Sequence, residues 1–275
     1  KPAVFAFSIN FFAILISPLW FIPISAIKYG LVIIFILNGI IIYYIFMKSK
    51  TYSIILARGG SKGIKNKNLV KINNKPLIFW TIFQSLKSKK IDEVWVSSDS
   101  KKILSISKKI GANIIKRPKK YSGDRASSES AWIHAINSIK DINHKKDIIV
   151  APQITSPIRS KNDFNEAIKK FNKHKLDSLF SGFFFEVFFS WKYKKQKVIP
   201  KYNLKQRPQR QKIYKNIVEN GSFYIFTANG FLKSKNRLFG KIGCHIMKKE
   251  SSFQIDEKDD INFFNFLSNK KKFFK

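Results

Sequence analysis

The alternation of strand-like and helix-like segments after residue 51 does most to limit the folds open to this chain. The pattern predicts, in chain order, strand, helix, strand, helix, helix, strand, helix and strand at residues 52–57, 76–87, 93–98, 101–110, 127–139, 147–151, 161–173 and 178–185. Such alternation is typical of an α/β fold with a doubly wound, mostly parallel sheet. Ligands of these sheets bind beyond the carboxyl ends of the strands, so we expect the functional site at that edge.

A glycine-rich basic loop follows the first predicted strand. It reads Leu56-Ala57-Arg58-Gly59-Gly60-Ser61-Lys62-Gly63 and runs on to Lys67-Asn68. Its glycines let backbone N–H groups approach phosphate oxygens, and Arg58, Lys62 and Lys67 supply positive charge. The spacing fits neither a Walker A loop nor a dinucleotide fingerprint. The loop predicts a site for a nucleoside triphosphate or a relative, although glycines after a strand can also serve only as a turn.

Further short motifs follow the loop in the order Val96-Ser97-Ser98-Asp99, Arg117-Pro118, Asp124-Arg125-Ala126-Ser127-Ser128, Gln153-Ile154-Thr155-Ser156-Pro157-Ile158-Arg159, Arg207-Pro208-Gln209-Arg210-Gln211, Glu219-Asn220-Gly221-Ser222-Phe223-Tyr224-Ile225-Phe226, Ile255-Asp256 and Asp259-Asp260. Each motif is weak alone. The ordered set resembles the acylneuraminate cytidylyltransferases, or CMP-sialic acid synthetases, including relatives that activate legionaminic or pseudaminic acid. The resemblance covers about residues 52–266 and implies a nucleotide-diphospho-sugar transferase-like fold.

The resemblance implies a reaction and a set of residues for it. CMP would pass from CTP to the anomeric hydroxyl of an acidic nine-carbon (nonulosonic) sugar, with release of pyrophosphate, to supply activated sugars for surface glycans. The implied catalytic residues are Arg58, Lys62, Lys67 and Asp256. The implied nucleotide-binding residues are Ala57, Arg58, Gly59, Lys62, Asn68, Arg117, Ala126, Ser127 and Ser128. The implied acceptor-binding residues are Gln153, Arg210, Asn220, Tyr224 and Phe239.

Some of these residues have a second interpretation. Ser127 and Ser128 can equally cap the helix that follows them. Tyr224 and Phe239 lie in apolar runs and can equally be core residues. Arg210 suits a sugar carboxylate, because the planar guanidinium matches its two oxygens.

The metal site implied by the resemblance is altered in this chain. Family members commonly carry Asp-Ile-Asp near the C-terminal end, whose two carboxylates hold Mg²⁺. Here the stretch reads Gln254-Ile255-Asp256, so an amide replaces the first carboxylate. We expect Mg²⁺ as cofactor, with Asp256 as the main ligand and Asp99 as a second one. The departure leaves the metal affinity, the rate and the choice of sugar open.

The net charge of +35 first suggests a nucleic-acid-binding protein. However, only seven of the 52 basic residues are arginines, and the lysines are spread along the chain. We interpret most of the charge as a solvated lysine surface and expect no nucleic-acid partner.

The single cysteine, Cys244, excludes an internal disulfide and fits a reducing compartment. The four histidines have no metal-ligand spacing, so no zinc site is expected.

Residues 1–50 form an apolar N-terminal segment outside the enzyme pattern, before a cytidylyltransferase domain at residues 51–275. Residues 30–47 are an uncharged run near the lower limit for a membrane-spanning helix, and residues 3–27 are a second apolar stretch. By the positive-inside rule, Lys48 and Lys50 would leave the rest of the chain in the cytoplasm, anchored at the inner face of the membrane through residues 3–47. Alternatively, the segment is upstream sequence translated before a start near Met47.

An aromatic, basic insertion at about residues 183–214 interrupts the alternation. In the family, the corresponding insertion is a dimerisation arm, which implies a homodimer. The other interpretation is a local aromatic cluster within one subunit.

Two other functions compete with catalysis. A catalytically weakened homologue that only binds nucleotide would explain Gln254. A basic protein of the membrane surface would explain the charge and the apolar N-terminus, but it leaves the motifs without a role.

Overall fold

The computed structural model describes residues 30–37, 40–47, 49–61, 63–185, 191–207, 209 and 216–270. For residues 30–37, 40–47 and 268–270 it describes the backbone only. The chain divides into two compact units, Lys1–Ser49 and Lys50–Lys275. The second unit carries every motif of the sequence and is described first.

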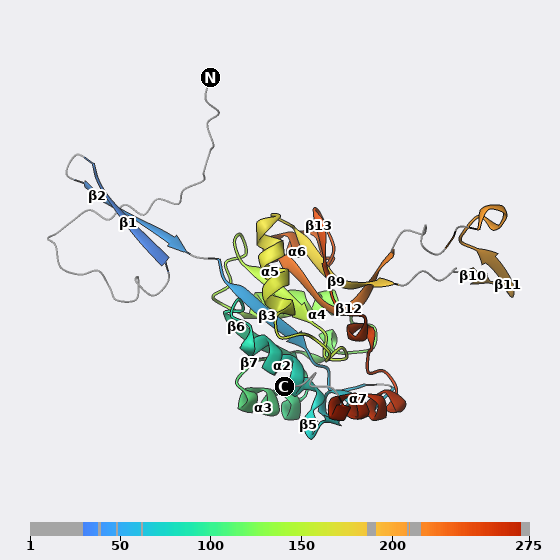
Figure 1. The fold of residues 1–275 in the computed structure, drawn as a ribbon. Coiled ribbons are helices and arrows are strands. Elements are labelled where there is room, and N and C mark those ends of the chain that lie inside the picture. Colours follow the sequence, from blue (N-terminus) through green and yellow to red (C-terminus); the bar gives the residue numbers. More distant parts are fainter. Residues whose placement is uncertain are drawn as a thin grey trace. The chain divides into compact units, whose positions relative to one another are not determined.

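A seven-stranded sheet forms the centre of this unit, in the order β13-β9-β12-β8-β3-β6-β7 (Figure 1). Its strands are β3 (Thr51–Leu56), β6 (Glu93–Ser98), β7 (Asn113–Lys116), β8 (Ile148–Pro152), β9 (Ser178–Phe185), β12 (Asn216–Thr227) and β13 (Ile242–Ile246). Only β12 runs antiparallel to its neighbours, β8 and β9. The predicted α/β fold with a mostly parallel sheet is confirmed.

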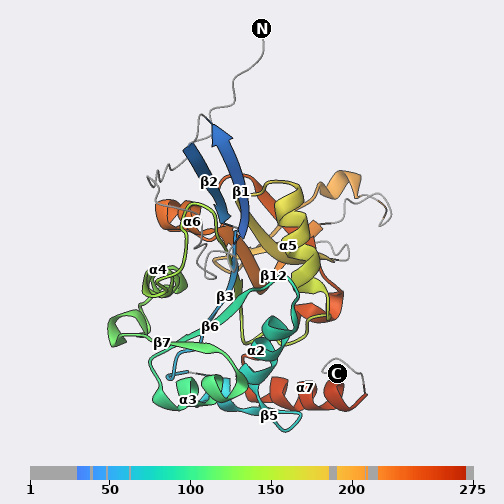
Figure 2. The same ribbon diagram turned by 90° about the vertical axis from the view of Figure 1, so that its left-hand side faces the viewer.

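Helices cover both faces of the sheet (Figure 2). They are α2 (Leu77–Lys87), α3 (Lys101–Ile110), α4 (Ser128–Ser138), α5 (Asp163–Lys173), α6 (Ala228–Ser234) and α7 (Lys258–Lys270). Short 3-10 turns occur at Lys67–Leu69, Lys119–Tyr121, Leu204–Gln206 and Lys249–Ser252, and β4 (Lys71–Ile72) pairs with β5 (Lys75–Pro76).

Alternate residues of each strand pack on opposite helix layers, as the two-residue period of a strand requires. In β12, Tyr224 and Phe226 face the core under α4 and α6, with Trp132 and Phe231. Phe223 and Ile225 face the core under α5, with Phe164. A third core joins β6 to α2 and α7. The two sets of helices therefore hold the sheet rigid beneath the strand ends.

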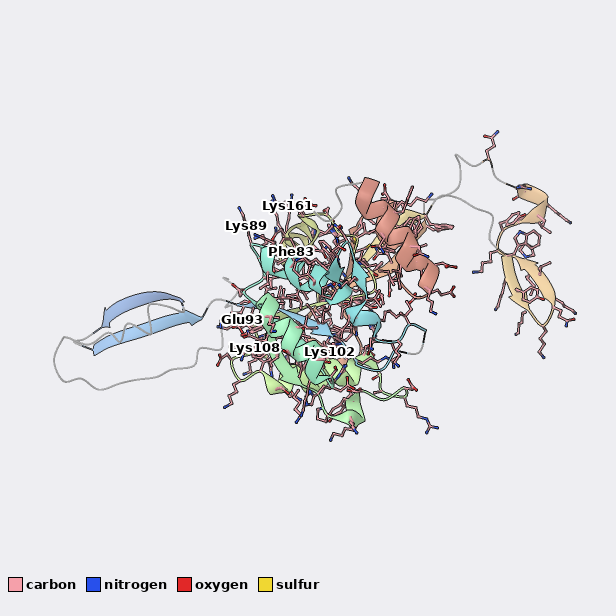
Figure 3. All side chains as sticks on the ribbon, turned by 90° about the horizontal axis from the view of Figure 1, so that it is seen from below. Phe83, Lys89, Glu93, Lys102, Lys108 and Lys161 are labelled. Atoms are coloured by element: carbon pink, nitrogen blue, oxygen red, sulfur yellow. The ribbon has the colours of Figure 1, made fainter. Side chains whose placement is uncertain are left out.

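The lysines are spread over the surface of this unit. Figure 3 labels Lys89 after α2, Lys102 and Lys108 on α3, and Lys161 before α5, at separate places on one face. This distribution matches the predicted solvated lysine surface.

The first unit corrects the prediction of an apolar helix at residues 30–47. These residues form two antiparallel strands, β1 (Gly30–Leu37) and β2 (Ile40–Met47). The run is rich in β-branched and aromatic residues, and Asn38-Gly39 stands between its halves, which is a strong hairpin signal. No helix among the described residues is both long and apolar enough to cross a membrane. Residues 3–27 of the predicted membrane segment lie outside the described residues.

The predicted insertion contains a small hairpin of β10 (Trp191–Lys194) and β11 (Lys197–Pro200). Its apolar side chains are exposed, Tyr193 and Val198 most of all. Trp191 makes an edge-to-face contact with Tyr202 at 5.8 Å between ring centroids. The insertion therefore combines a local aromatic contact with apolar surface left exposed in the single chain.

Candidate active site

A cavity of about 290 Å³ lies where β3 and β8 end. We call it the strand-end cavity; it is lined by Leu56, Arg58, Ser61, Gly63, Lys67, Asn68, Ser128, Trp132, Pro152, Gln153, Ile154 and Thr155. Five of the residues predicted for the site line it together, namely Arg58, Lys67, Asn68, Ser128 and Gln153. They come from three separate motifs, as expected for the carboxyl edge of a parallel sheet.

The glycine-rich loop is fixed at both ends by polar contacts. The backbone N–H of Gly59 donates to Asp99 Oδ1 at 2.8 Å, and Asn68 Nδ2 donates to the Arg58 carbonyl oxygen at 2.9 Å. At Gly63, a Cβ would lie 2.8 Å from the carbonyl oxygen of Asp256, so the close approach requires glycine. Asp99, predicted as a metal ligand, therefore already holds the loop.

Arg58 joins the loop to the motif around Ser127. Its Nη1 lies 3.2 Å from Asp124 Oδ1, and both side chains reach solvent. An exposed ion pair of this kind contributes little to stability. The guanidinium can therefore exchange its carboxylate partner for a phosphate at small cost.

Arg117 is a buried cation with unused donors. Its side chain is 5% exposed, and neither Nε nor Nη2 has a hydrogen-bond partner among the residues that the structure describes. Burial lowers its pKa; nearby Asp99 opposes this effect, and nearby Arg58 adds to it. Buried donors are almost always satisfied, so an unsatisfied arginine beside a loop of this kind indicates a ligand that accepts hydrogen bonds.

Helix α4 begins at the cavity. Ser127 Oγ accepts from the Ser130 N–H at 3.1 Å and caps the helix, whereas Ser128 lines the cavity. Ala126, just before the cap, donates its N–H to the Gly123 carbonyl at 3.0 Å. The N-terminal end of a helix favours anions, so α4 adds to the positive potential made by Arg58 and Lys67.

Lys67 and Asp256 form an ion pair at 3.0 Å beside the cavity. Gln254, in the place of the family's first carboxylate, donates its Nε2 to the Asn220 carbonyl oxygen at 2.9 Å. No group of three or more His, Cys, Asp or Glu side chains that could hold a metal occurs in the described part of the chain. Mg²⁺ commonly takes one or two carboxylates and completes its shell with water and substrate phosphates. The side chains present therefore fit a Mg²⁺ ion that Asp256 would hold together with the phosphates of a nucleotide. They do not fit a Mg²⁺ ion coordinated by protein ligands alone.

A model of the family described as "Cytidylyltransferase" matches residues 52–271. The chain belongs to this family. It is 35% identical over 208 residues to the N-acylneuraminate cytidylyltransferase of Oncorhynchus mykiss, which covers 74% of this chain and 47% of that protein. It is 30% identical over 224 residues to the pseudaminic acid cytidylyltransferase of Campylobacter jejuni, which covers 79% of this chain and 96% of that protein. The chain thus spans about half the length of the Oncorhynchus mykiss protein and nearly all of the Campylobacter jejuni protein.

A solved structure shares the fold at low identity. CMP:2-keto-3-deoxy-manno-octonic acid synthetase complexed with CTP matches with a TM-score of 0.61 and 14% identity, over 81% of this chain and 99% of that chain. The family and the fold predicted from the motifs are both confirmed.

The residues predicted to bind the acceptor do not all lie together in this chain. Gln153 lines the cavity, and its N–H donates to the Ser222 carbonyl at 2.9 Å. Tyr224 is buried in β12, and its hydroxyl donates to Glu219 Oε1. The ring of Phe239 packs on α6, where a Cβ at Gly230 would lie 2.2 Å from its Cε2. Neither aromatic residue is among the cavity-lining residues, and both have the core contacts of their second interpretation.

Asn220 lies inside the protein. Its side chain is 3% exposed; Oδ1 accepts from Ser181 Oγ and the Ser222 N–H, and Nδ2 donates to Ser251 Oγ at 2.9 Å. The amide is thus occupied by internal partners and supports the turn at Gly221. Direct contact of Asn220 with an acceptor stays a prediction. Lys62 and Arg210 lie outside the described residues.

The sequence-based site missed Arg159. This buried guanidinium donates to the Gln153 carbonyl at 2.5 Å, the Ser222 carbonyl at 2.7 Å and Gln84 Oε1 at 2.9 Å. Burial lowers its pKa to about 9, which Asp163 partly opposes. It ties the cavity residue Gln153 to β12 and α2. The sequence feature that could have indicated this role is the place of Arg159 in the motif that begins at Gln153.

Proposed function

We propose that this chain transfers CMP from CTP to the anomeric hydroxyl of a nonulosonic acid, releasing pyrophosphate. The observation that carries the proposal is the convergence of the Arg58 loop, Ser128 and Gln153 on one cavity. The relatives, an N-acylneuraminate cytidylyltransferase and a pseudaminic acid cytidylyltransferase, supply the substrate class. The particular acid is left to experiment.

In the proposed reaction, the anomeric hydroxyl loses its proton to water as its oxygen bonds to the α-phosphorus of CTP. The bond between the α-phosphorus and the oxygen that bridges to the β-phosphorus breaks, and this oxygen leaves with pyrophosphate. The chain's part is to fix the triphosphate in line and to offset its charge. Arg58 and Lys67 would contact the phosphates, together with Lys62. Arg117 and the start of α4 would hold the cytidine, because Arg117 has buried donors without a described partner near Arg58 and Ser128 of α4 lines the cavity.

Mg²⁺ is proposed as the cofactor. When bound, it would neutralise phosphate charge on the nucleotide. Asp256 would hold it, and Lys67 would release its ion pair with Asp256 to reach the phosphates. Asp99 and Gln254 would act through the loop and the Asn220 turn that they contact.

A homodimer is proposed from the exposed insertion. Five of its apolar residues, Trp191, Tyr193, Val198, Ile199 and Leu204, are exposed in the single chain. Large apolar side chains that gather on a protein surface are ordinarily covered by a partner. Light scattering on the wild type and on a Tyr193→Ser, Val198→Ser double variant would test it, a dimer being expected only for the wild type.

The test of the reaction is pyrophosphate release from CTP with a panel of nonulosonic acids. Arg58→Ala should reduce turnover by about 10²–10³-fold while leaving the thermal unfolding midpoint nearly unchanged, since the side chain contacts ligand and not core. Lys102→Ala, which removes an exposed charge on α3, is the matched control and should keep activity. Wild-type turnover by Arg58→Ala would exclude the proposed role of Arg58.

A second candidate is a nucleotide-binding homologue without turnover, because Gln254 replaces a carboxylate. It predicts that CTP binds, as measured by calorimetry, and that no acid leads to pyrophosphate release.

Membrane association through residues 3–47 is a separate proposal. Fractionation of the full chain beside a version beginning at Met47 would test it.

A further inference from the structure

A cluster of polar and aromatic side chains lies next to the strand-end cavity, and none of its residues is proposed above to contact the nucleotide. Arg237, which follows α6, donates its Nε to Glu129 Oε1 at 2.7 Å. Its guanidinium carbon lies 4.9 Å from the ring centroid of Trp132 and 4.9 Å from that of Tyr224. Two aromatic rings and one carboxylate therefore fix the guanidinium, which is unusual for a flexible side chain.

The cluster is placed beside the cavity by the elements that carry it. Glu129 is in the first turn of α4. It lies in the sequence between Ser128 and Trp132, the two residues of α4 that line the cavity. Tyr224 pairs with Ala151 in β8, one residue before Pro152, which also lines the cavity. The side chains of Arg237 and Glu129 are 21% and 23% exposed, so both are fixed yet reachable.

The charge of the cluster limits what it can bind. The hydrogen bond from Arg237 offsets the effect of burial on Glu129 and holds the pKa of that carboxyl below its ordinary value. Burial and Glu219 raise the pKa of Tyr224 to about 12, so its hydroxyl stays neutral and donates to Glu219. The cluster thus has two carboxylates, Glu129 and Glu219, and one guanidinium.

A ligand carboxylate would be repelled by this excess of negative charge. A hydroxyl or an acylamido group suits it better, because such a group both donates and accepts hydrogen bonds. The guanidinium offers donors, and the carboxylate beside it offers acceptors. Carboxylates are scarce in this chain, 17 against 52 basic residues, which makes two at this place a specific feature.

We propose that Arg237 and Glu129 determine acceptor specificity, by binding an uncharged hydroxyl or acylamido substituent of the sugar acid. The inference rests on the proposed function and deepens it. It gives the pair a task distinct from carboxylate binding. A site built to hydrogen-bond such a group rejects an analogue without it, because its own polar groups are then left unpaired.

The experiment measures kcat/KM with CTP for pairs of nonulosonic acids that differ by one hydroxyl or acylamido group. The wild type should prefer one member of a pair. Arg237→Met should lower kcat/KM for the preferred acid by about 10- to 100-fold and change the other acid much less, so that the preference is lost. The KM for CTP should stay unchanged. Lys233→Met, which removes an exposed charge on α6, is the matched control and should keep the preference.

Glu129→Gln guards against a folding defect in Arg237→Met, because it removes the charge and keeps the shape. It should weaken the same preference in a folded protein, as verified by circular dichroism. Equal losses for both acids, or an unchanged preference in both variants, would overturn the proposal. If the wild type releases no pyrophosphate with any acid, the proposed function fails and the specificity inference fails with it. Wild-type turnover with unchanged preference in the variants refutes the specificity inference alone.

Discussion

The ammonium nitrogen of Lys67 lies 3.0 Å from Asp256 Oδ1 and 3.0 Å from the carbonyl oxygen of Ile255. Lys67 also lines the strand-end cavity. The carboxylate that the family pattern assigns to the metal is therefore neutralised by a lysine that the same pattern assigns to phosphate. In the proposed reaction the ion pair between the two side chains would have to break. Lys67 and Asp256 would then each affect the reaction separately.

Lys67→Met should lower kcat/KM for CTP by about 10²–10³-fold, because a positive charge that meets the phosphates is removed. Initial rates of pyrophosphate release measure it. Lys65→Met is the control, since Lys65 is exposed and two residues away. Equal losses in both variants would mean that only the general charge of the loop matters.

Gln254→Asp tests the amide that replaces the first carboxylate of the family. The sequence alone predicts that this change keeps or raises Mg²⁺-dependent activity. The structure adds a cost, because an aspartate cannot donate to the Asn220 carbonyl as Gln254 Nε2 does. We expect the free energy of unfolding to fall by about 1–3 kcal/mol, measured by urea denaturation. Unchanged stability would show that the hydrogen bond contributes nothing.

The fold was predictable because strands and helices in this chain keep their characteristic periods. The predicted elements at residues 93–98, 101–110 and 178–185 have the observed bounds, and the other predicted elements shift by one or two residues. Residues 30–47 form a hairpin and not the predicted helix, because their β-branched residues and the Asn38-Gly39 pair favour strands and a tight turn, which length and hydropathy do not reflect.

The site was predictable only in part. A parallel sheet brings strand ends to one edge, so Arg58, Ser128 and Gln153 could be placed together from sequence. Burial depends on packing between distant segments, which a single sequence does not encode locally. This is why the internal hydrogen bonds of Asn220 and the position of Arg159 behind Gln153 emerged only from the structure.

Arg117→Met should weaken CTP binding and stabilise the free protein. The arginine is buried, and two of its nitrogen atoms have no partner among the described residues, so its removal should raise the free energy of unfolding by about 1–3 kcal/mol. The CTP dissociation constant should rise about tenfold or more, because a charged hydrogen-bond donor is lost. Calorimetric titration and urea denaturation measure the two effects. A destabilised variant with unchanged CTP affinity would make Arg117 a structural residue.

The pH dependence of stability should report on His134, which is next to Arg117. Burial lowers the pKa of His134, and the positive charges of Arg117 and Lys120 lower it further; its ring also packs on Tyr121. Because the folded-state pKa lies below the unfolded value of about 6.5, the unfolded chain binds the proton more readily. Stability is therefore full above about pH 6.5 and falls as the pH drops from there through the folded-state pKa, with a slope of at most about 1.4 kcal/mol per pH unit from this group.

His134→Gln removes this titration without adding charge. Urea denaturation between about pH 5 and pH 7 should show a shallower loss of stability for the variant than for the wild type, in a range where most carboxylates stay ionised. His144→Gln, at an exposed position, is the matched control and should follow the wild type. Parallel curves for all three proteins would mean that the proton is taken up elsewhere. A shallower curve for His134→Gln alone would show that His134 titrates beside Arg117, the cation proposed to hold the cytidine.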